Sequence, residues 1–217
     1  MNYRDVQALL DEGEGFQVEF KRRVSNSEKI AKALVGFANT KGGTILFGID
    51  DDRTVVGVES EKSEVEMIKE VAEFYCEPPV DVDIEIIPFK GKDVIAVLVE
   101  ESRQKPHAIL GHEDSKESQL QAYIRVNDKT VEASKEVVRI LRSENPDAPP
   151  LRIAIGENER RLFDFLEQNE RITLREFGDL VNISKRRASR TLIQLVRAGV
   201  LRVHTNEKGE YFTRTSD

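Results

Sequence analysis

The clearest hydrophobic pattern in the chain lies between residues 27 and 58. Apolar residues at helical spacing, Ile30, Leu34, Phe37 and Ala38, predict an amphipathic helix. Gly42 and Gly43 are expected to end it, because glycine accepts the positive φ that a helix C-cap needs. The short apolar run at 44–49 then predicts a central strand buried on both faces, and 54–58 predicts a returning hairpin strand.

Alternation and periodicity extend the pattern to residue 141. Strict alternation at 16–21 places Phe16, Val18 and Phe20 on one face of a strand. Helices are predicted at 3–10, 60–75 and 134–141, and further strands at 82–89, 94–99 and 122–126. Residues 101–120 have no strong pattern and are expected to form a long loop. Because helices and strands mix without regular alternation, the fold class is α+β, a mixed sheet with flanking helices.

A proline-rich segment separates this region from the rest of the chain. Residues 145–150 are Asn-Pro-Asp-Ala-Pro-Pro, and prolines prevent a helix from crossing them. We place the boundary between residues 145 and 156. This gives a first domain at 1–147 and a second at 156–217.

The second domain has the pattern of three helices followed by a hairpin. The helices are expected at 159–168, 174–181 and 184–198, and the strands at 200–204 and 211–213. Thr173 and Glu176 have the spacing of a capping box for the middle helix, and Asn182 begins the turn before the third. This order of elements is typical of a winged helix-turn-helix domain.

The third of these helices carries a basic outer face, while Ala188, Leu192, Leu195 and Val196 fall on its inner face. The residues expected to contact nucleic acid are Lys185, Arg186, Arg187, Arg190, Gln194 and Arg197. Cations at a helix N-terminus oppose the helix dipole, so helix stability does not explain them, whereas contacts to phosphates and bases do. The alternative is a solvated basic face on a winged helix that docks proteins.

Charge is divided unevenly between the two predicted domains. The 217 residues carry a net charge of −7, yet residues 156–217 hold 12 Lys and Arg against 10 Asp and Glu. An acidic body beside a mildly basic tail indicates two modules with different surfaces. The single cysteine, Cys76, excludes an internal disulfide, and no apolar run approaches the roughly 20 residues that cross a membrane. We therefore expect a cytoplasmic protein with no membrane partner.

The first domain resembles the Schlafen AlbA-type domain, also called a divergent AAA domain. The motifs that carry the resemblance are Glu14 with VEFK at 18–21, FANTKGG at 37–43, GIDD at 48–51, VGV at 56–58, KPH at 105–107 and YIRV at 123–126. The similarity covers about residues 10–142. It implies a DNA-binding domain of the kind that occurs with a helix-turn-helix module behind it. The chain lacks a GxxxxGK[ST] phosphate loop, so the AAA label does not extend to nucleotide binding.

The resemblance also implies an enzymatic alternative. Vertebrate Schlafen relatives include RNases that cut structured RNA with three carboxylates, which map to Glu14, Glu19 and either Asp50 or Asp51. Clustered carboxylates hold Mg²⁺ or Mn²⁺, which positions water and stabilises a phosphoryl transition state. The residues alone also allow a plainer reading, in which Glu19 beside Lys21 is a solvent-facing strand pair and the aspartates form a hairpin turn. The Schlafen zinc site has no match, because it needs several Cys and His ligands.

The leading hypothesis is a DNA-binding transcriptional regulator that needs neither a cofactor nor a metal. It is expected to bind duplex DNA as a homo-oligomer, since helix-turn-helix proteins commonly read two-fold sites as dimers. The first alternative is a metal-dependent endoribonuclease or nuclease, with Mg²⁺ or Mn²⁺ as cofactor and structured RNA as substrate. The second is an adaptor that uses both modules to dock proteins.

Overall fold

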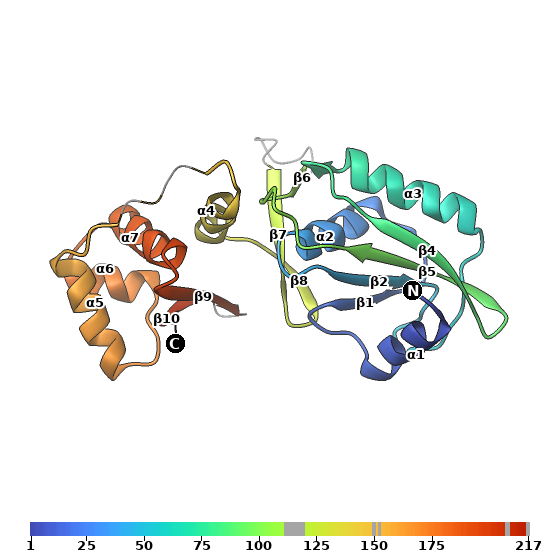
Figure 1. Cartoon of the computed structure of the whole chain (residues 1–217), viewed down its shortest axis with the longest axis horizontal. Helices are drawn as coiled ribbons and strands as arrows, with labels where there is room; N and C mark the ends of the chain where they lie inside the picture. The colour runs from blue at the N-terminus through green and yellow to red at the C-terminus, as the bar shows by residue number, and fades with distance from the viewer. Residues whose placement is uncertain (111–119, 149–150, 152, 207–208, 216–217) are drawn as a thin grey trace. The chain divides into compact units, whose positions relative to one another are not determined.

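The structure is a computed structural model that describes residues 1–110, 120–148, 151, 153–206 and 209–215 (Figure 1). It divides into two compact units, Met1–Ala133 (unit 1) and Ser134–Asp217 (unit 2). The predicted α+β class is confirmed. Among the described residues, no helix is long and apolar enough to cross a membrane.

The division between the units lies earlier than the predicted linker. Helix α4, Lys135–Glu144, belongs to unit 2, because it packs against α7, Lys185–Arg197. The expected boundary between residues 145 and 156 is therefore too late for the contacts of the chain. The prolines there end α4 without separating it from the helices that follow. Independent folding of 1–147 and 156–217 stays a prediction.

Unit 1 contains a mixed four-stranded sheet in the order β1-β2-β5-β4. Its strands are β1 (Val18–Lys21), β2 (Gly43–Phe47), β4 (Asp83–Phe89) and β5 (Lys92–Val99). Strands β1 and β2 are parallel, and the other two pairs are antiparallel. The central position of β2 confirms the prediction from its apolar run.

Helices cover both faces of this sheet, and each face has its own core. Helices α2 (Ser27–Ala38) and α3 (Glu61–Phe74) pack with Ile45 and Phe47 on one face. Helix α1 (Tyr3–Glu12) packs with Leu46 on the other face. Figure 1 shows α1 and α3 on opposite sides of the sheet. Successive residues of β2 therefore enter opposite cores, which explains why the strand has no polar side.

A second sheet in unit 1 was only partly expected. Its order is β3-β6-β7-β8, with β3 (Cys76–Glu77), β6 (Ala108–Leu110), β7 (Leu120–Val126) and β8 (Lys129–Glu132). Only β7 was predicted. The expected loop at 101–120 contains β6, which pairs with β3 and β7, and β8 follows β7 after a two-residue turn. Both sheets contact α2.

Three local expectations for unit 1 need correction. Gly42 and Gly43 were expected to end helix α2. The helix instead ends at Ala38, with Asn39 as its C-cap, about one turn before the glycines. Residues 54–58 form no strand, since a single bridge from Ile49 to Val55 is their only strand-like pairing. Phe16 precedes β1 and is 40% exposed, whereas Val18 and Phe20 are buried.

The two glycines before β2 allow close packing of the backbone. Gly42 has φ +65°, which confirms that one of the pair needs a positive φ. A Cβ on Gly42 would lie 2.5 Å from the Val99 carbonyl oxygen, and a Cβ on Gly43 would lie 2.5 Å from that of Gln17. Neither position has room for a side chain.

Unit 2 contains the expected three helices and hairpin. They are α5 (Glu157–Gln168), α6 (Leu174–Val181), α7, β9 (Leu201–Asn206) and β10 (Gly209–Arg214). The Thr173–Glu176 capping box is present, and its hydrogen bonds hold the pKa of Glu176 below the ordinary value. Leu162, Phe177, Leu192 and Phe212 are among the buried residues that join helices and hairpin in one core.

Candidate functional site

Helix α7 begins after a tight turn that fixes its start. Asn182 adopts the left-handed conformation with φ 53°, which asparagine tolerates better than most residues. Ser184 caps α7 by accepting a hydrogen bond from the Arg187 main-chain N–H at 3.4 Å. The Ile183 N–H donates to the Gly178 carbonyl oxygen at 3.0 Å, which holds the turn against the end of α6.

The inner and outer faces of α7 follow the predicted pattern. Ala188, Leu192 and Leu195 are buried in the core of unit 2. The predicted contact residues divide into two groups by exposure: Lys185, Arg186, Arg187 and Arg190 are exposed, and Gln194 and Arg197 are half-buried. The exposed group therefore lies entirely in the first half of the helix.

Most of this exposed group has no anionic partner. Within the described part of the chain, no ion pair includes Arg186, Arg187 or Arg190. The first turn of α7 contains no acidic residue. Cations at this end of a helix are repelled by the helix dipole, so their placement lowers helix stability and suits an anionic ligand.

A third face of α7 contacts α4, which sequence reasoning missed. Ser189 is 1% exposed, and its hydroxyl donates to Glu136 Oε1 at 3.2 Å and accepts from Arg139 at 2.9 Å. Ile193 is buried one turn later on the same side. The sequence carried a weak signal for this contact. Ser189 and Ile193, at i and i+4, lie beside the inner face of α7 and make its small and apolar side wider than packing against the core of unit 2 alone requires.

A groove of about 650 Å³ lies beside the outer face of α7. Arg187, Arg190 and Gln194 form one wall, and residues 156–159 at the start of α5 form another. The groove brings three of the six predicted contact residues to one surface. Arg197 lies outside its lining.

In unit 1, the three carboxylates of the proposed metal site have separate structural roles. Glu14 Oε1 accepts a hydrogen bond from the Phe20 N–H at 2.8 Å. Because β1 is the edge strand of its sheet, this bond satisfies a main-chain donor that no neighbouring strand reaches. Glu14 therefore supplies the hydrogen-bond acceptor for a main-chain N–H on the outer edge of β1.

Glu19 lies between two cations. Its carboxylate forms ion pairs with Lys21 and with Arg125 on β7. The Arg125 side chain is 1% exposed, donates to the Gly15 carbonyl at 2.6 Å and lies 4.6 Å from the centre of the Phe37 ring. These contacts neutralise the Glu19 carboxylate and join β1, α2 and β7.

The aspartates after β2 form a turn. Asp50 pairs with the exposed Arg22, and Asp51 is exposed. Asp52 accepts from the Thr54 N–H at 2.8 Å, and hydrogen bonds from Thr54 hold its pKa below the ordinary value. In the residues that the structure describes, no group of three or more His, Cys, Asp or Glu side chains is placed to hold a metal ion. The structure thus gives Glu14, Glu19 and Asp50 different partners.

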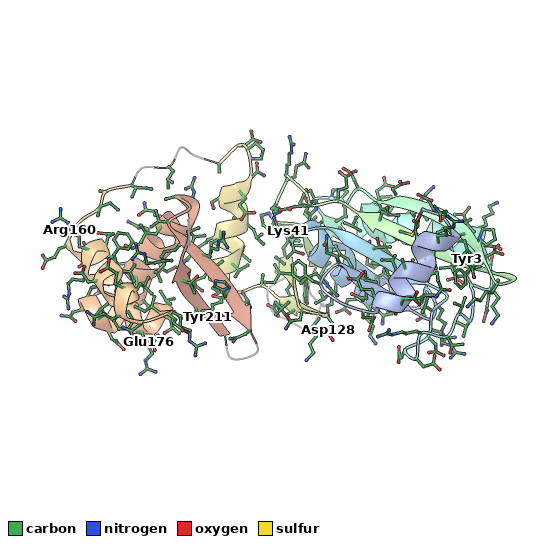
Figure 2. All side chains as sticks on the ribbon, turned by 60° about the horizontal axis from the view of Figure 1, so that its bottom comes forward. Tyr3, Lys41, Asp128, Arg160, Glu176 and Tyr211 are labelled. Carbon is green, nitrogen blue, oxygen red and sulfur yellow. The ribbon has the colours of Figure 1, made fainter. Side chains whose placement is uncertain are left out.

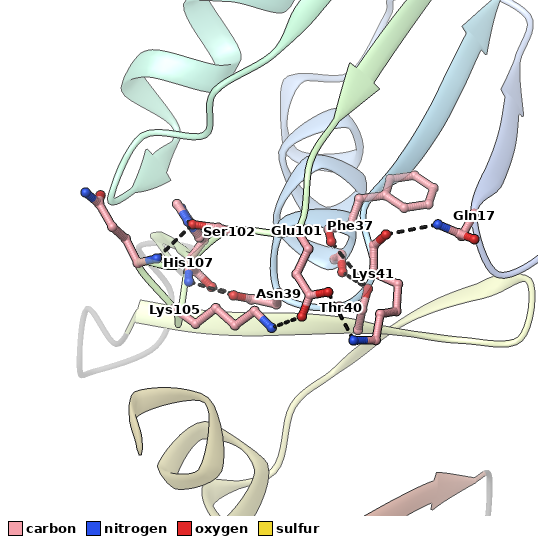
Figure 3. Close-up of polar contacts among 11 residues, drawn as sticks. Gln17, Phe37, Asn39, Thr40, Lys41, Glu101, Ser102, Lys105 and His107 are labelled. Carbon is pink, nitrogen blue, oxygen red and sulfur yellow. Dashed lines mark hydrogen bonds and ion pairs between the residues drawn. The ribbon is translucent and has the colours of Figure 1, made fainter. Parts of the chain in front are cut away.

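The FANTKGG and KPH motifs meet in a buried polar network (Figure 3). The Asn39 side chain, 2% exposed, donates to the carbonyl oxygens of His107 and Tyr123 at 2.8 and 2.9 Å. It also accepts from the His107 N–H at 2.8 Å. Asn39 therefore holds the end of α2 against β6 and β7.

The side chains around His107 are also paired. Its ring contacts the Pro78 carbonyl through Nδ1 at 2.8 Å and Ser102 Oγ through Nε2 at 2.7 Å. Glu101 joins two lysines, with 2.7 Å to Lys105 Nζ and 3.1 Å to Lys41 Nζ (Figure 3). Burial raises the pKa of Glu101, and the two lysines outweigh it, so the pKa lies below the ordinary value. The sequence also offers His107 and His112 as a pair of metal ligands without a third, and His112 lies outside the described residues.

Comparisons with known proteins locate unit 1 within a family. A family model described as Schlafen, AlbA_2 matches residues 14–134. No curated protein matches the chain. One similar solved structure is the N-terminal domain of a RecG-related protein from Nitrosomonas europaea, with 20% identity and a TM-score of 0.44 over 58% of this chain and 89% of that chain. Another is the DIP2311 protein from Corynebacterium diphtheriae, with 15% identity and a TM-score of 0.47. That match covers 97% of this chain and 38% of that chain.

Proposed function

This chain belongs to the Schlafen AlbA_2 family, and from that premise we propose that it is a transcriptional regulator that binds duplex DNA. Unit 2 acts as a winged helix-turn-helix domain, with α7 as the helix that enters the major groove. Unit 1 assembles the subunits or adds DNA contacts. The protein works on cytoplasmic DNA.

The observation that carries this proposal is the group of cations at the start of α7. Lys185, Arg186, Arg187 and Arg190 are exposed, and they stand at the helix end whose dipole repels them. Such a group binds the phosphate backbone through charge, and an arginine reads guanine through two hydrogen bonds. Helix-turn-helix proteins use the N-terminal residues of the second helix for base contacts.

The other two residues of the predicted face have different roles in this proposal. Gln194 lines the groove beside Arg187 and Arg190, and we assign its side-chain amide to a phosphate contact. Arg197 stands in the last turn of α7, where the dipole favours a cation. We assign Arg197 to helix stability and phosphate attraction, and base reading to the first half of the helix.

The test is a fluorescence anisotropy titration of duplex DNA at several salt concentrations. Arg187→Ala and Arg190→Ala should each weaken binding by about 1–3 kcal/mol if they read bases, or reduce the salt slope by about one unit if they contact phosphate. Arg160→Ala removes the same charge from an exposed position on α5 (Figure 2) and should leave affinity nearly unchanged.

Two further measurements distinguish the alternatives. A hairpin RNA in the same titration, with and without Mn²⁺, tests structured RNA as a partner and nuclease activity on it. Sedimentation of the complex with a two-fold site tests the expected homo-oligomer. An Arg187/Arg190 double variant with native affinity for duplex DNA would falsify the assignment of α7.

A further inference from the structure

A second groove lies in unit 1, away from the acidic residues considered for metal binding. Its volume is about 710 Å³. The lining includes an apolar group, namely Ala38, Val80, Val82, Leu98 and Val99, and a charged group, namely Asp81, Asp83, Glu100, Glu101 and Arg103. Ser102 and His107 also line it, and neither has a role in the proposed DNA contact.

Ser102 and His107 have the geometry of a nucleophile and its base. The Pro78 carbonyl is a hydrogen-bond acceptor, so His107 Nδ1, at 2.8 Å, carries the ring proton. His107 Nε2 is then unprotonated and accepts from the Ser102 hydroxyl at 2.7 Å. The Gln104 N–H donates to Ser102 Oγ at 3.0 Å, which leaves the serine proton directed at the histidine. The carbonyl thus fixes the tautomer, as the third group of a catalytic triad does.

Two more features complete the arrangement. In the described part of the chain, the Arg103 main-chain N–H makes no hydrogen bond. The amide after a nucleophilic serine is a common donor to the oxyanion in acyl transfer. Burial lowers the pKa of His107, although the Pro78 hydrogen bond and Asp81 act in the opposite direction. Burial therefore favours the neutral imidazole, whose Nε2 can accept a proton.

We propose that Ser102 is an activated nucleophile, with His107 as its general base, for hydrolysis of a small uncharged carboxylic ester. The groove has apolar walls that suit the acyl or alcohol part. Glu101 is paired with two lysines, and the other three carboxylates of the lining still outnumber the single Arg103, so a polyanion such as nucleic acid is repelled. This activity is separate from the DNA contact assigned to α7.

The reaction balances with these groups and water. Ser102 Oγ forms a bond to the ester carbonyl carbon while its proton passes to His107 Nε2, and the carbonyl electron pair moves to oxygen beside the Arg103 N–H. The tetrahedral carbon then releases the alcohol oxygen, which takes the proton from Nε2, and an acyl-serine remains. Water adds to that ester with His107 again as base, and collapse of the intermediate releases the acid and restores the Ser102 hydroxyl.

The test is covalent labelling of the full chain with a fluorophosphonate, with the modified residue identified by mass spectrometry. We expect labelling at Ser102, its complete loss in Ser102→Ala, and native labelling in Ser60→Ala, a control serine exposed at the start of α3. His107→Gln should slow labelling by about 10²–10⁴-fold. Hydrolysis of p-nitrophenyl acetate should follow the same order.

Two results would overturn the proposal. One is a native protein that gains no label at Ser102 and hydrolyses the ester no faster than Ser102→Ala. The other is a His107→Gln variant with a native circular dichroism spectrum that labels at the native rate. If His107→Gln does not fold, the comparison of the native chain with Ser102→Ala still decides the matter. Neither result bears on DNA binding by α7.

Discussion

Charged residues in two regions of this molecule have opposite surroundings. In unit 1, Glu14 satisfies a strand edge and Glu19 is enclosed by Arg125 and Lys21. In unit 2, Arg186, Arg187 and Arg190 are exposed without an ion pair in the described residues. The carboxylates of the first group form contacts within unit 1, whereas the guanidinium groups of the second are available to a ligand. The sequence offered both groups as sites, the cations in the leading hypothesis and the carboxylates in an alternative. Pairing, rather than residue type, separates them in the structure.

The strongest test of this comparison is the removal of Arg125. Arg125→Leu leaves the Glu19 carboxylate with only 15% exposure and without its buried partner, so the free energy of unfolding should fall by about 3–5 kcal/mol. Urea unfolding measures it. Arg22→Leu breaks the exposed pair with Asp50 and should cost at most about 1 kcal/mol. Equal losses in the two variants would show that burial of the pair has no special weight.

Substitutions of the two glycines before β2 test how closely the backbone of unit 1 is packed, as the Arg125 variant tests its buried ion pair. Gly42→Ala should lower the free energy of unfolding by about 1–3 kcal/mol, because its positive φ is strained for alanine and the new Cβ would lie 2.5 Å from the Val99 carbonyl oxygen. Gly43→Ala should lower it by about 1–3 kcal/mol through overpacking. Thermal melts of both variants are compared with Gly91→Ala. Gly91 shares the positive φ but has open space, so a loss at Gly91 as large as at Gly42 would assign the effect to φ alone.

The buried His107 makes the stability of unit 1 depend on pH. Burial lowers its pKa, so the neutral ring is favoured in the folded state, while Asp81 and Lys105 act on it in opposite directions. The unfolded chain therefore takes up a proton first as pH falls. Stability from this group is complete above about pH 6.5 and declines as pH falls toward the lowered pKa. Urea unfolding at pH 7.5 and pH 5.5 measures the decline, which should be smaller in His107→Gln.

The smallest effect is expected from divalent metal. Because Glu14, Glu19 and Asp50 have other partners, millimolar Mn²⁺ should leave the melting temperature of the native chain almost unchanged. A rise that disappears in the Glu19→Gln, Asp50→Asn double variant would instead support the carboxylate site, since a bound metal stabilises the fold by mass action.

The sequence predicted the features that depend on residues a few positions apart. The stripe of α7, its Ser184 cap, the Thr173–Glu176 capping box and the two-sided burial of β2 follow from neighbours within a few positions. Periodicity therefore predicted the exposure of Lys185, Arg186, Arg187 and Arg190, and their contact with DNA stays a prediction.

The features that were missed depend on distant residues. Strand β6 is three residues long and exists because β3 and β7 pair with it. The prediction assigned α4 to the first domain. The contact of α4 with α7 joins Arg139 and Ser189, which are 50 positions apart, so no local pattern indicates it. The pairing of Glu19 with Arg125 spans 106 positions, so no local pattern distinguishes it from a free carboxylate.

The Arg125 contacts also set an order for the growth of unit 1 during synthesis. Its guanidinium binds Gly15 and Glu19, so these two residues receive this partner only after β7 has been synthesised. Among the strands that the structure describes, β1 pairs with β2 alone. That pairing is parallel, and parallel pairing joins residues that are far apart in the chain. Contacts of such long range make folding slow, because chain entropy is lost before the contacts form. A nascent chain that ends before residue 125 therefore lacks the guanidinium that pairs with Glu19 and binds the Gly15 carbonyl oxygen.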